Sequence, residues 1–499
     1  MTEKFDIAII GAGLGGLECA LMLSKHGKKV CVLEKNPLIG GCLQTFRRDG
    51  HKFDTGFHYV GGLDEGQMLN KLFSYFGLMD LPWVKMSDEC FDEVFIKDKH
   101  YNIPQGYDKY KQALTTYFPD QKDGIEKWVD LLKKVGDNIE KSFAPKTTDD
   151  FYTQSLFAQS AYKYLTDIFS NQDIIDVISG PSIKMELCAE KLPLYTFAQI
   201  NSSFIQSAYR LRGGGMQIAE TLRKQIEANG SVVKRNAEVI NAKACDGKLE
   251  ALVLKNTDLV YADIFISDIH PSATMNLMAD SGLLRNIYRK RINNLENTFG
   301  MFTTHLQLKP NAIKYLNKNI YAYSESDLWH IDQTPSKGDV KEILISMNPP
   351  QNTESEYVDS IDVLTPMKWS EVEKWFGTKI ESRGKDYEQL KQNVAVKSLE
   401  IASKYIAGLK ESVDKIYTST PLTYCDYIGT KDGSAYGIRK DYNQPMFTIL
   451  TPRTPIPNLY LTGQSLNLHG ILGTSMTSIF TCAEILGLET IVKDLNKVK

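Results

Sequence analysis

The stretch FDIAIIGAGLGGLECALMLSKHGKKVCVLE, residues 5–34, decides the fold. The apolar run Phe5–Ile10 predicts a buried strand, the glycine turn Gly11–Gly16 follows it, and apolar residues at helical spacing predict a helix after the turn. A second apolar run, Lys29–Leu33, predicts another strand, which ends at Glu34. Strand, glycine turn, helix, strand and an acidic residue about twenty positions past the glycines indicate a Rossmann-type dinucleotide-binding unit.

Each position of the glycine turn has a physical task. Gly11 permits the tight turn, Gly13 leaves room for a pyrophosphate against the backbone, and Gly16 lets the helix pack closely on the strand. The helix starts near Leu14 and Gly15, where free N–H groups and the positive end of the helix dipole favour phosphate anions. The turn is therefore expected to hold the diphosphate of a dinucleotide.

The residues after the second strand indicate which dinucleotide binds. Glu34 is placed to accept hydrogen bonds from ribose hydroxyls, and its carboxylate would repel a 2′-phosphate. Lys35 follows, and a second glycine turn comes at Gly40 and Gly41. This turn resembles the extended FAD fingerprint of glutathione-reductase-like flavoproteins, in which the paired glycines approach the ribityl chain and pyrophosphate. FAD is therefore expected, and a plain surface loop is the alternative.

A further motif extends the resemblance. Asp54–Gly61 reads DTGFHYVG and, with the fingerprint, resembles the FAD-dependent phytoene desaturase, carotenoid isomerase and retinol saturase family, leaning toward the retinol saturase branch. Three more segments support the match: Arg212–Met216 (RGGGM), which opens a predicted helix, Ala237–Ile240 (AEVI), in a predicted strand, and Leu459–Gln464 (LYLTGQ). The resemblance is specific near both ends of the chain and weak in its middle.

The carboxy-terminal segment has the same local pattern as the first one. Asn458–Leu461 predicts a buried strand, Gly463 a turn, and Gly470 and Gly473 precede an apolar helical run. The resemblance implies that this segment closes over FAD, with Gln464 in place of the acidic residue that family members usually carry. The full set expected to bind FAD is Gly11, Gly13, Leu14, Gly15, Gly16, Glu34, Lys35, Gly40, Gly41, Val239, Gly463, Gln464, His469 and Gly470.

Cofactor segments at the start, middle and end of the chain predict a discontinuous α/β architecture. The resemblance implies a Rossmann-like, glutathione-reductase-type FAD domain and a mixed α+β substrate domain with helical cover. The predicted FAD domain comprises residues 1–90, 210–285 and 425–499, and the predicted substrate domain comprises residues 91–209 and 286–424. Residues 105–210 are rich in helical patterns and aromatic side chains, which suits an apolar tunnel or an ordinary core.

Histidines near the flavin are the candidate acids and bases. The resemblance places His58 near the substrate cavity, where a neutral imidazole could orient or protonate a polyene carbon, and Tyr59 could donate a hydrogen bond. His469 is expected at a helix start, where the dipole would lower its pKa and keep it neutral. Lys184 and Glu186 are expected to be structural.

The leading hypothesis is an FAD-dependent oxidoreductase that acts on CH–CH groups. It would saturate, desaturate or isomerise carbon–carbon double bonds of a carotenoid, retinoid or similar polyene. A flavin amine oxidase shares the fingerprint and the carboxy-terminal segment, and a non-catalytic prenyl-binding escort protein reuses the fold; both are alternatives. Gly213–Gly215 lacks a third glycine at the right spacing and an acidic partner, so NAD(P)H would visit transiently as an electron donor.

Composition excludes several other classes. The 499 residues carry 58 Lys and Arg against 61 Asp and Glu, a net charge of −3, which gives no global case for nucleic-acid binding. The eight cysteines have no C-x-x-C pair and no metal-ligand spacing, so they are expected to be reduced packing residues, with no metal site. The uncharged run from Leu192 to Tyr209 contains too many polar residues for a membrane span.

Location and substrate entry follow from the same reasoning. No targeting segment precedes the first strand, so a cytoplasmic protein is expected. A polyene of about twenty to forty carbons would lose tens of kcal/mol in crossing water, at about 0.8 kcal/mol per carbon. The substrate is therefore expected to come directly from a membrane surface, through a peripheral contact that the sequence does not localise.

Overall fold

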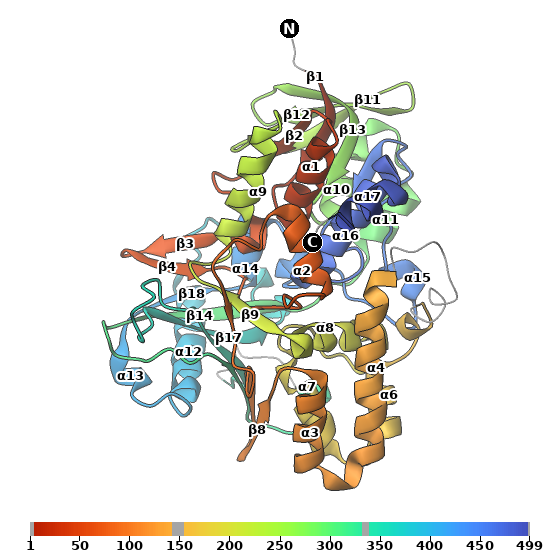
Figure 1. The fold of residues 1–499 in the computed structure, drawn as a ribbon. Helices are drawn as coiled ribbons and strands as arrows, with labels where there is room; N and C mark the ends of the chain where they lie inside the picture. The colour runs from red at the N-terminus through yellow and green to blue at the C-terminus, as the bar shows by residue number, and fades with distance from the viewer. Residues whose placement is uncertain (1–3, 142–153, 332–338, 498–499) are drawn as a thin grey trace.

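The computed structural model describes residues 4–141, 154–331 and 339–497 (Figure 1). Its strands form two seven-stranded sheets and two small sheets of two and three strands. In Figure 1 the first large sheet lies at the top, and the second lies below it beside a group of helices. The functional argument depends on the region between these two sheets.

The first sheet gathers strands from three distant parts of the chain. Its strands are β1 (Lys4–Ile10), β2 (Val30–Leu33), β10 (Val232–Lys234), β11 (Val239–Cys245), β12 (Lys248–Leu254), β13 (Leu259–Ser267) and β19 (Leu459–Leu461). They follow the order β10-β2-β1-β13-β12-β11, and β19 pairs with the end of β13. β10, β2, β1, β13 and β19 are parallel to one another, whereas β12 pairs antiparallel with both β13 and β11. The carboxyl ends of β1, β2, β13 and β19 therefore share one edge.

Helices cover this sheet. They are α1 (Leu14–Lys25), α2 (Met68–Phe76), α9 (Met216–Ala228), α10 (Pro271–Leu277), α11 (Asn286–Asn293), α16 (Gly470–Leu486) and α17 (Leu488–Leu495). Leu17 of α1, Ile218 of α9 and Ile479 of α16 are fully buried in one apolar core with Ile7 and Ile9 of β1. The first and last helical segments of the chain are thus packed together in one domain (Figure 1).

The second sheet is mostly antiparallel. Its strands are β7 (Asp92–Ile96), β8 (Lys99–Ile103), β14 (Gly300–Leu308), β15 (Asn319–Tyr323), β16 (Glu342–Met347), β17 (Ser360–Met367) and β18 (Val413–Ser419). Their order is β18-β14-β17-β16-β15-β7-β8, and only the β15–β7 pair is parallel. Two segments far apart in sequence, around residues 92–103 and 300–419, therefore build one sheet.

Both faces of the second sheet are covered, as the alternation of its side chains requires. Leu344 and Leu364 belong to a core shared with a helical layer, whereas Ile343 and Val363, one position earlier, pack on the opposite face. The helical layer consists of α3 (Tyr107–Tyr117), α4 (Lys122–Lys141), α6 (Ala161–Ile168), α7 (Gln172–Ser179) and α8 (Leu194–Gln206). The opposite face is covered by α12 (Lys385–Ala402), which α13 (Leu409–Ser412) follows.

The small sheets and short helices connect the two large parts. They are β3 (Thr45–Arg48) with β4 (His51–Asp54), β5 (Val60–Gly61) with β9 (Ala208–Leu211) and β6 (Trp83–Lys85), α14 (Pro421–Thr423), and α15 (Pro445–Thr448). A π-helical turn, Tyr424–Ile428, follows α14. These elements place the DTGFHYVG motif between the two sheets.

The predicted fold class, a Rossmann-like α/β domain with a mixed α+β partner, is confirmed. The residue boundaries of the two domains stay a prediction. Two local expectations differ from the structure. The strand expected over residues 237–240 begins at Val239. The helix expected after Gly470 and Gly473 begins at Gly470, so both glycines lie inside it.

Candidate functional site: two cavities that meet over a glycine turn

Two cavities meet over the glycine turn that follows β1. The strand-end cavity, of about 580 Å³, lies at the carboxyl ends of β1 and β2. The inner cavity, of about 290 Å³, lies between the turn and the second sheet. Gly13, Gly41, Asp268 and Gln464 line both cavities. An elongated ligand can therefore run from one cavity into the other, in a combined space typical of ligand sites, roughly 300–1,000 Å³.

The glycine turn forms the floor where the cavities meet. Gly11 has a φ of +95°, which favours glycine, and Gly13, which has no side chain of its own to cap the helix, precedes α1. A Cβ atom on Gly16 would lie 2.4 Å from the carbonyl oxygen of Gly11, so only glycine allows this close packing of helix on strand. The N–H groups at the start of α1 face the junction, as an anion site requires.

The second glycine turn packs against the first. Gly40 donates its N–H to the carbonyl of Ala12 at 2.7 Å and has a φ of +103°. A Cβ atom on Gly41 would lie 3.5 Å from Cα of Gly13. The two turns, thirty residues apart in sequence, therefore form one continuous glycine surface along the junction.

Glu34 lies at the end of β2 and lines the strand-end cavity with Lys35 and Val239. Its carboxylate is buried and accepts hydrogen bonds from the N–H groups of Ala12 at 3.1 Å and Asn36 at 2.9 Å. Burial raises the pKa of this carboxyl. The side chain is thus held rigidly at the cavity wall, where a ribose would meet it.

Asp268 is a residue at the junction that the sequence analysis missed. It follows β13, and its carboxylate accepts hydrogen bonds from the N–H groups of Gly13 and Gly16. Cβ atoms placed on Gly15 or Gly463 would each lie 2.7 Å from its Oδ1. Burial raises the pKa of Asp268 to about 7. The only signal in the sequence is an acidic residue after an apolar run, and that signal becomes informative once β13 is known to lie beside β1.

Asp54 of the DTGFHYVG motif lies outside both cavities and has a structural task. Its Oδ1 accepts a hydrogen bond from the N–H of Gly215 at 3.0 Å, and its Oδ2 accepts one from the Asn348 side chain at 2.8 Å. A Cβ atom on Gly214 would lie 2.6 Å from the same carboxylate. Asp54 therefore holds the turn Gly213–Gly215 in place, and the absence of a second dinucleotide site there stays a prediction.

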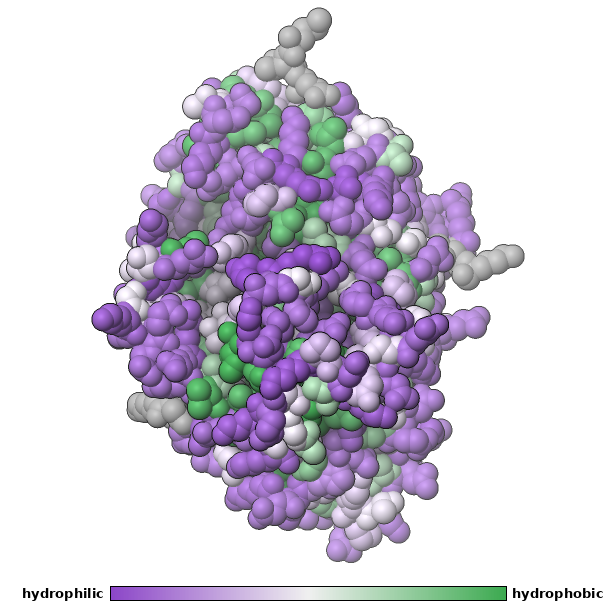
Figure 2. Space-filling model, turned by 90° about the vertical axis from the view of Figure 1, so that its left-hand side faces the viewer, coloured by the Kyte–Doolittle hydropathy of each residue, from purple (hydrophilic) through white to green (hydrophobic). Residues whose placement is uncertain are grey.

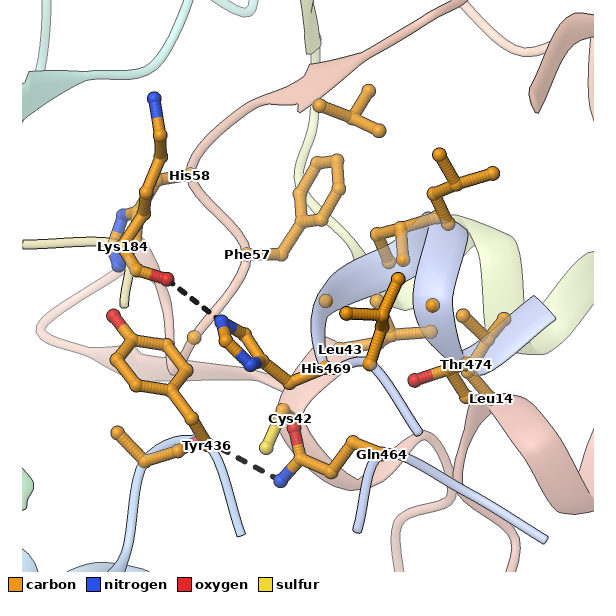
Figure 3. Close-up of a pocket in the computed structure, with 18 of the residues that line it drawn as sticks. Leu14, Cys42, Leu43, Phe57, His58, Lys184, Tyr436, Gln464, His469 and Thr474 are labelled. Atoms are coloured by element: carbon orange, nitrogen blue, oxygen red, sulfur yellow. Dashed lines mark hydrogen bonds between the residues drawn. The ribbon is translucent and has the colours of Figure 1, made fainter. Parts of the chain in front are cut away.

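The carboxy-terminal segment closes the junction from the other side (Figure 3). Gly463 follows β19 with a φ of +97° and faces Asp268, and Gln464 donates from Nε2 to the carbonyl of Ala435 at 3.5 Å. Of the residues expected to bind FAD, Gly16 and Gly463 line neither cavity, because they support the turn from behind, whereas the others line at least one.

His469 precedes α16 and connects the carboxy-terminal segment to Lys184 and Tyr436. Its Nε2 bonds to the main-chain carbonyl of Lys184 at 3.1 Å, and its ring packs on Tyr436 at a centroid distance of 4.5 Å (Figure 3). The pKa of His469 is lowered to about 4, mainly by burial. The direction agrees with the expectation of a neutral ring, but burial rather than the helix dipole is the largest cause.

His58 and Tyr59 both line the inner cavity. Burial lowers the pKa of His58 to about 4, and its Nδ1 lies 3.9 Å from the carboxylate of Asp362. The Tyr59 hydroxyl lies 2.7 Å from the Tyr321 hydroxyl and 3.2 Å from Oδ2 of Asp92. His58 is therefore a neutral ring at the wall, and Tyr59 belongs to a buried polar group behind it.

Lys184 also lines the inner cavity, which the sequence analysis did not foresee. Its Nζ lies 3.4 Å from the Tyr59 hydroxyl, 3.9 Å from Oδ2 of Asp92, and 4.3 Å from the ring centre of Phe204. Glu186, two positions on, pairs with Arg439 through two contacts of 2.6 and 2.8 Å, which is the structural role expected for it.

The rest of the inner cavity is mainly apolar. Met301, Leu344 and Leu364 contribute from the second sheet, and Ile200 and Phe204 contribute from α8. These walls face the glycine junction across the cavity. A flat or elongated apolar molecule placed there would lie between the cofactor segments and the second sheet.

Other chemistries find no support in the described parts of the chain. Within residues 4–141, 154–331 and 339–497, no group of three or more His, Cys, Asp or Glu side chains could hold a metal ion. The eight cysteines, all within these ranges, are free thiols. Across the same ranges, no helix is both long enough and apolar enough to span a membrane.

Comparison with known proteins gives a consistent result. Residues 9–76 match the family model described as an NAD(P)-binding Rossmann-like domain. The all-trans-retinol 13,14-reductase of Danio rerio is 27% identical over 97% of this chain and 86% of its own length. Prolycopene isomerase 2 of an Oncidium hybrid cultivar is 23% identical over 93% of this chain and 80% of its own length.

Solved structures share the fold. Cyclohexylamine oxidase from Brevibacterium oxydans matches with a TM-score of 0.62 and 12% identity, covering 99% of both chains. An oxidoreductase from Methanosarcina mazei matches with a TM-score of 0.60 and 16% identity, covering 95% of this chain and 98% of its own. The predicted resemblance is thus confirmed by relatives along nearly the whole sequence, and these structures support the fold.

Proposed function

We propose that this chain, a relative of the all-trans-retinol 13,14-reductases and prolycopene isomerases along nearly its whole length, is an FAD-dependent oxidoreductase acting on carbon–carbon double bonds of an apolar polyene. The observation that carries the proposal is the meeting of the two cavities over one glycine surface. The strand-end cavity suits the adenosine half of FAD, and the inner cavity suits its flavin ring together with a substrate.

The residues at the junction fit FAD. The N–H groups at the start of α1, two of which donate to Asp268, suit a diphosphate, and Glu34 suits a ribose without a 2′-phosphate. When bound, the flavin supplies hydride transfer, and the protein supplies orientation and a dry site. The further contacts to FAD that we propose are Gly11, Leu14, Gly15, Lys35, Gly40, Val239, Gln464, His469 and Gly470. A transient visit by NAD(P)H is proposed as the source of electrons for the saturating reaction.

The substrate is proposed to be a polyene of the retinoid or carotenoid type. Met301, Leu344 and Leu364 offer an apolar wall, and His58 is proposed to orient the chain as a neutral ring. Burying each CH₂-sized unit contributes about 0.8 kcal/mol, so a long chain gains much from such a wall. We propose this placement of the polyene between the apolar wall and the glycine junction for saturation, desaturation and isomerisation alike.

Peripheral contact with a membrane is proposed for substrate entry. Figure 2 shows the side of the molecule away from α15, and this face is mostly hydrophilic with scattered apolar residues. Met446 and Phe447 on α15 are 86% and 51% exposed. Co-sedimentation with liposomes tests the contact: Met446→Ser with Phe447→Ser is expected to release the protein, and unchanged sedimentation would move the contact elsewhere.

A flavin amine oxidase is the enzymatic alternative. Its substrates carry a cation at neutral pH, and the inner cavity already holds the Lys184 amine beside Tyr59. A second cation would therefore enter an unfavourable site. The non-catalytic escort alternative leaves the glycine surface and the buried Glu34 without a task.

The test uses the purified full-length protein. We expect a yellow protein with one FAD per chain, which fluorescence after denaturation will quantify. The photoreduced protein is then mixed anaerobically with all-trans-retinol, β-carotene or prolycopene, and the oxidised protein is mixed with the same polyenes or with cyclohexylamine; products are identified by mass spectrometry. A polyene product changed by two hydrogens or by geometry supports the proposal. A colourless protein that takes up no FAD, or turnover of the amine alone, would contradict it.

A further inference from the structure

We propose that the Lys184 ammonium group, held by Tyr59 and Asp92, is the proton donor for double-bond saturation in the inner cavity. The inference rests on the proposed function and names the acid that this function requires. It starts from geometry: Lys184 is a nearly buried cationic side chain in a mainly apolar cavity, 10% exposed, and its Nζ lies next to the Tyr59 hydroxyl.

The backbone around Lys184 is fixed by residues of the cofactor side. His469 bonds to the carbonyl of Lys184, and the Tyr436 hydroxyl donates to the carbonyl of Ile183 at 2.5 Å. The Glu186–Arg439 pair holds the same segment two residues later. Three contacts within four residues therefore set the position of this segment relative to the flavin side of the cavity (Figure 3). A group that must meet a carbon next to the flavin needs this kind of placement.

Behind Lys184 lies a buried polar chain that holds its ammonium group. Tyr59 contacts Asp92 at 3.2 Å and Tyr321 at 2.7 Å. The other oxygen of Asp92 accepts a hydrogen bond from the Asn319 amide at 2.7 Å, and Arg210 donates to the Asn319 carbonyl oxygen at 2.7 Å. The chain thus connects the cavity wall to the interior of the second sheet, through β7 and β15.

The acidities of the three polar groups at the wall differ in a way that favours Lys184. Burial lowers the pKa of the Lys184 amine to about 8, whereas the nearby Asp92 charge opposes this shift. Burial lowers the pKa of His58 to about 4, so its ring has no acidic proton to give at neutral pH, and burial keeps the pKa of Tyr59 well above its usual value. An acid with a pKa near the working pH is the most effective donor.

The proposed step is balanced. One carbon of the double bond receives hydride from the reduced flavin, and its neighbour receives a proton from Lys184 Nζ, so two C–H bonds form and the C=C π bond is lost. The two electrons come from the flavin, which is oxidised, and Lys184 is left as a neutral amine. The neutral amine takes up a proton from solvent before the next turnover, while the Tyr59 hydroxyl and the Asp92 carboxylate hold Nζ in place. Isomerisation alone would require no net proton.

The test separates this step from cofactor binding. Lys184→Met, Lys184→Arg and the control Lys318→Met are compared with wild type; Lys318 pairs with Glu93 at 2.6 Å and does not line the inner cavity. Photoreduced protein is mixed anaerobically with all-trans-retinol, and flavin reoxidation is followed at its visible absorption band. FAD content and the oxidised flavin spectrum are measured on every variant.

We expect Lys184→Met to keep its FAD and spectrum but to be reoxidised about 10²–10⁴-fold more slowly, as expected on losing a general acid. In wild type the reoxidation rate should fall as the pH rises through about 8, since the donor must be protonated. Lys184→Arg should restore part of the rate and move this fall to higher pH, and Lys318→Met should behave as wild type.

A second variant keeps the proposal falsifiable if Lys184→Met does not fold. Tyr59→Phe removes the hydroxyl that holds Nζ, so it should slow the first turnover with FAD still bound. Reoxidation of Lys184→Met or of Tyr59→Phe at the wild-type rate, with FAD bound, would overturn the proposal and leave the proposed function intact. If the wild-type protein isomerises polyenes without reoxidation of its flavin, the proposed proton transfer is also overturned. If the wild-type protein acts on no polyene, both the proposed function and this step are overturned.

Discussion

Asp268 is a carboxylate held where the diphosphate of a dinucleotide would lie close to the start of α1. It already accepts hydrogen bonds from Gly13 and Gly16, and burial raises its pKa to about 7. A bound diphosphate adds a like charge nearby, which favours the protonated form of Asp268. Binding of FAD should therefore take up a proton at this residue.

The consequence is a pH-dependent affinity for FAD. We expect the dissociation constant to rise by about tenfold from pH 6.5 to pH 8.5, because binding then requires protonation of a carboxyl that is ionised in the free protein. Asp268→Asn keeps an acceptor oxygen without the charge, so its affinity should vary less with pH. Fluorescence titration with FAD measures both constants, and an equal slope in the variant would assign the proton to another group, such as Glu34 or Glu18.

Gly13 gives a steric prediction. A Cβ atom there would lie 2.5 Å from Oδ2 of Asp268, at the meeting point of the two cavities. Gly13→Val should therefore lower FAD affinity on the order of tenfold to a hundredfold or more, from about 1–3 kcal/mol of crowding. Gly66→Ala is the control for affinity: nothing lies within 4 Å of its Cβ position, so FAD binding should be kept, although its φ of +81° should cost some stability. Full flavin content in purified Gly13→Val protein would show that the diphosphate lies elsewhere.

Single residues differ in how far sequence alone reveals them. Gly13 and Glu34 could be assigned because strand, turn, helix and acid follow one another within thirty residues. Asp268 and Lys184 could not, since each acquires its neighbours through contacts with segments more than a hundred residues away. For Lys184, a local sequence pattern gives no sign that its side chain would line a cavity.

At the scale of elements, the segment from Ile183 to Glu186 is held by the carboxy-terminal part of the chain. Arg439 contributes most, since it pairs with Glu186 through two nitrogens and with Glu296 through a third. Arg439→Met should lower the free energy of unfolding by about 1.5–3 kcal/mol and also slow turnover, because Lys184 loses its fixed position.

Urea unfolding and steady-state kinetics measure the two effects of Arg439→Met. Lys163→Ala is the matched control: it breaks the exposed pair with Asp167 on α6 and should cost at most about 0.5 kcal/mol. Loss of stability in Arg439→Met with normal turnover would show that the clamp supports the fold without positioning Lys184.

Helices and strands could be predicted from the sequence where neighbouring residues alone decide the local structure. The strand expected over Phe5–Ile10 agrees with β1, because an apolar run that ends at a glycine turn needs little tertiary information. The order of strands in the second sheet could not be predicted, since β7 joins β15 across more than two hundred residues. Gly470, the first residue of α16, has a φ of +74°, a conformation that favours glycine at this position.

At the scale of the whole molecule, the proposed FAD site is built from the amino-terminal turn, Asp268 and the segment from Gly463 to Gly470. Binding would therefore link parts of the chain that only the folded protein brings together. At free FAD a hundred times its dissociation constant, the folded state should gain about 2.7 kcal/mol. Thermal unfolding with added FAD, AMP or riboflavin tests this, and equal melting temperatures with and without FAD would contradict the site.

The packing of α1 against α16 also has a consequence for the order of events during synthesis. Glu18 of α1 bonds to Ser475 and Ser478 of α16, more than 450 residues later in the chain. At about 5–20 residues per second, a ribosome needs about 20–90 s to make what lies between them. For that time the first helix lacks its partner and its buried carboxyl has no hydroxyl donors. The nascent amino terminus must therefore wait, open to chaperones, until the last helices leave the ribosome, and flavin loading becomes a late, post-translational step.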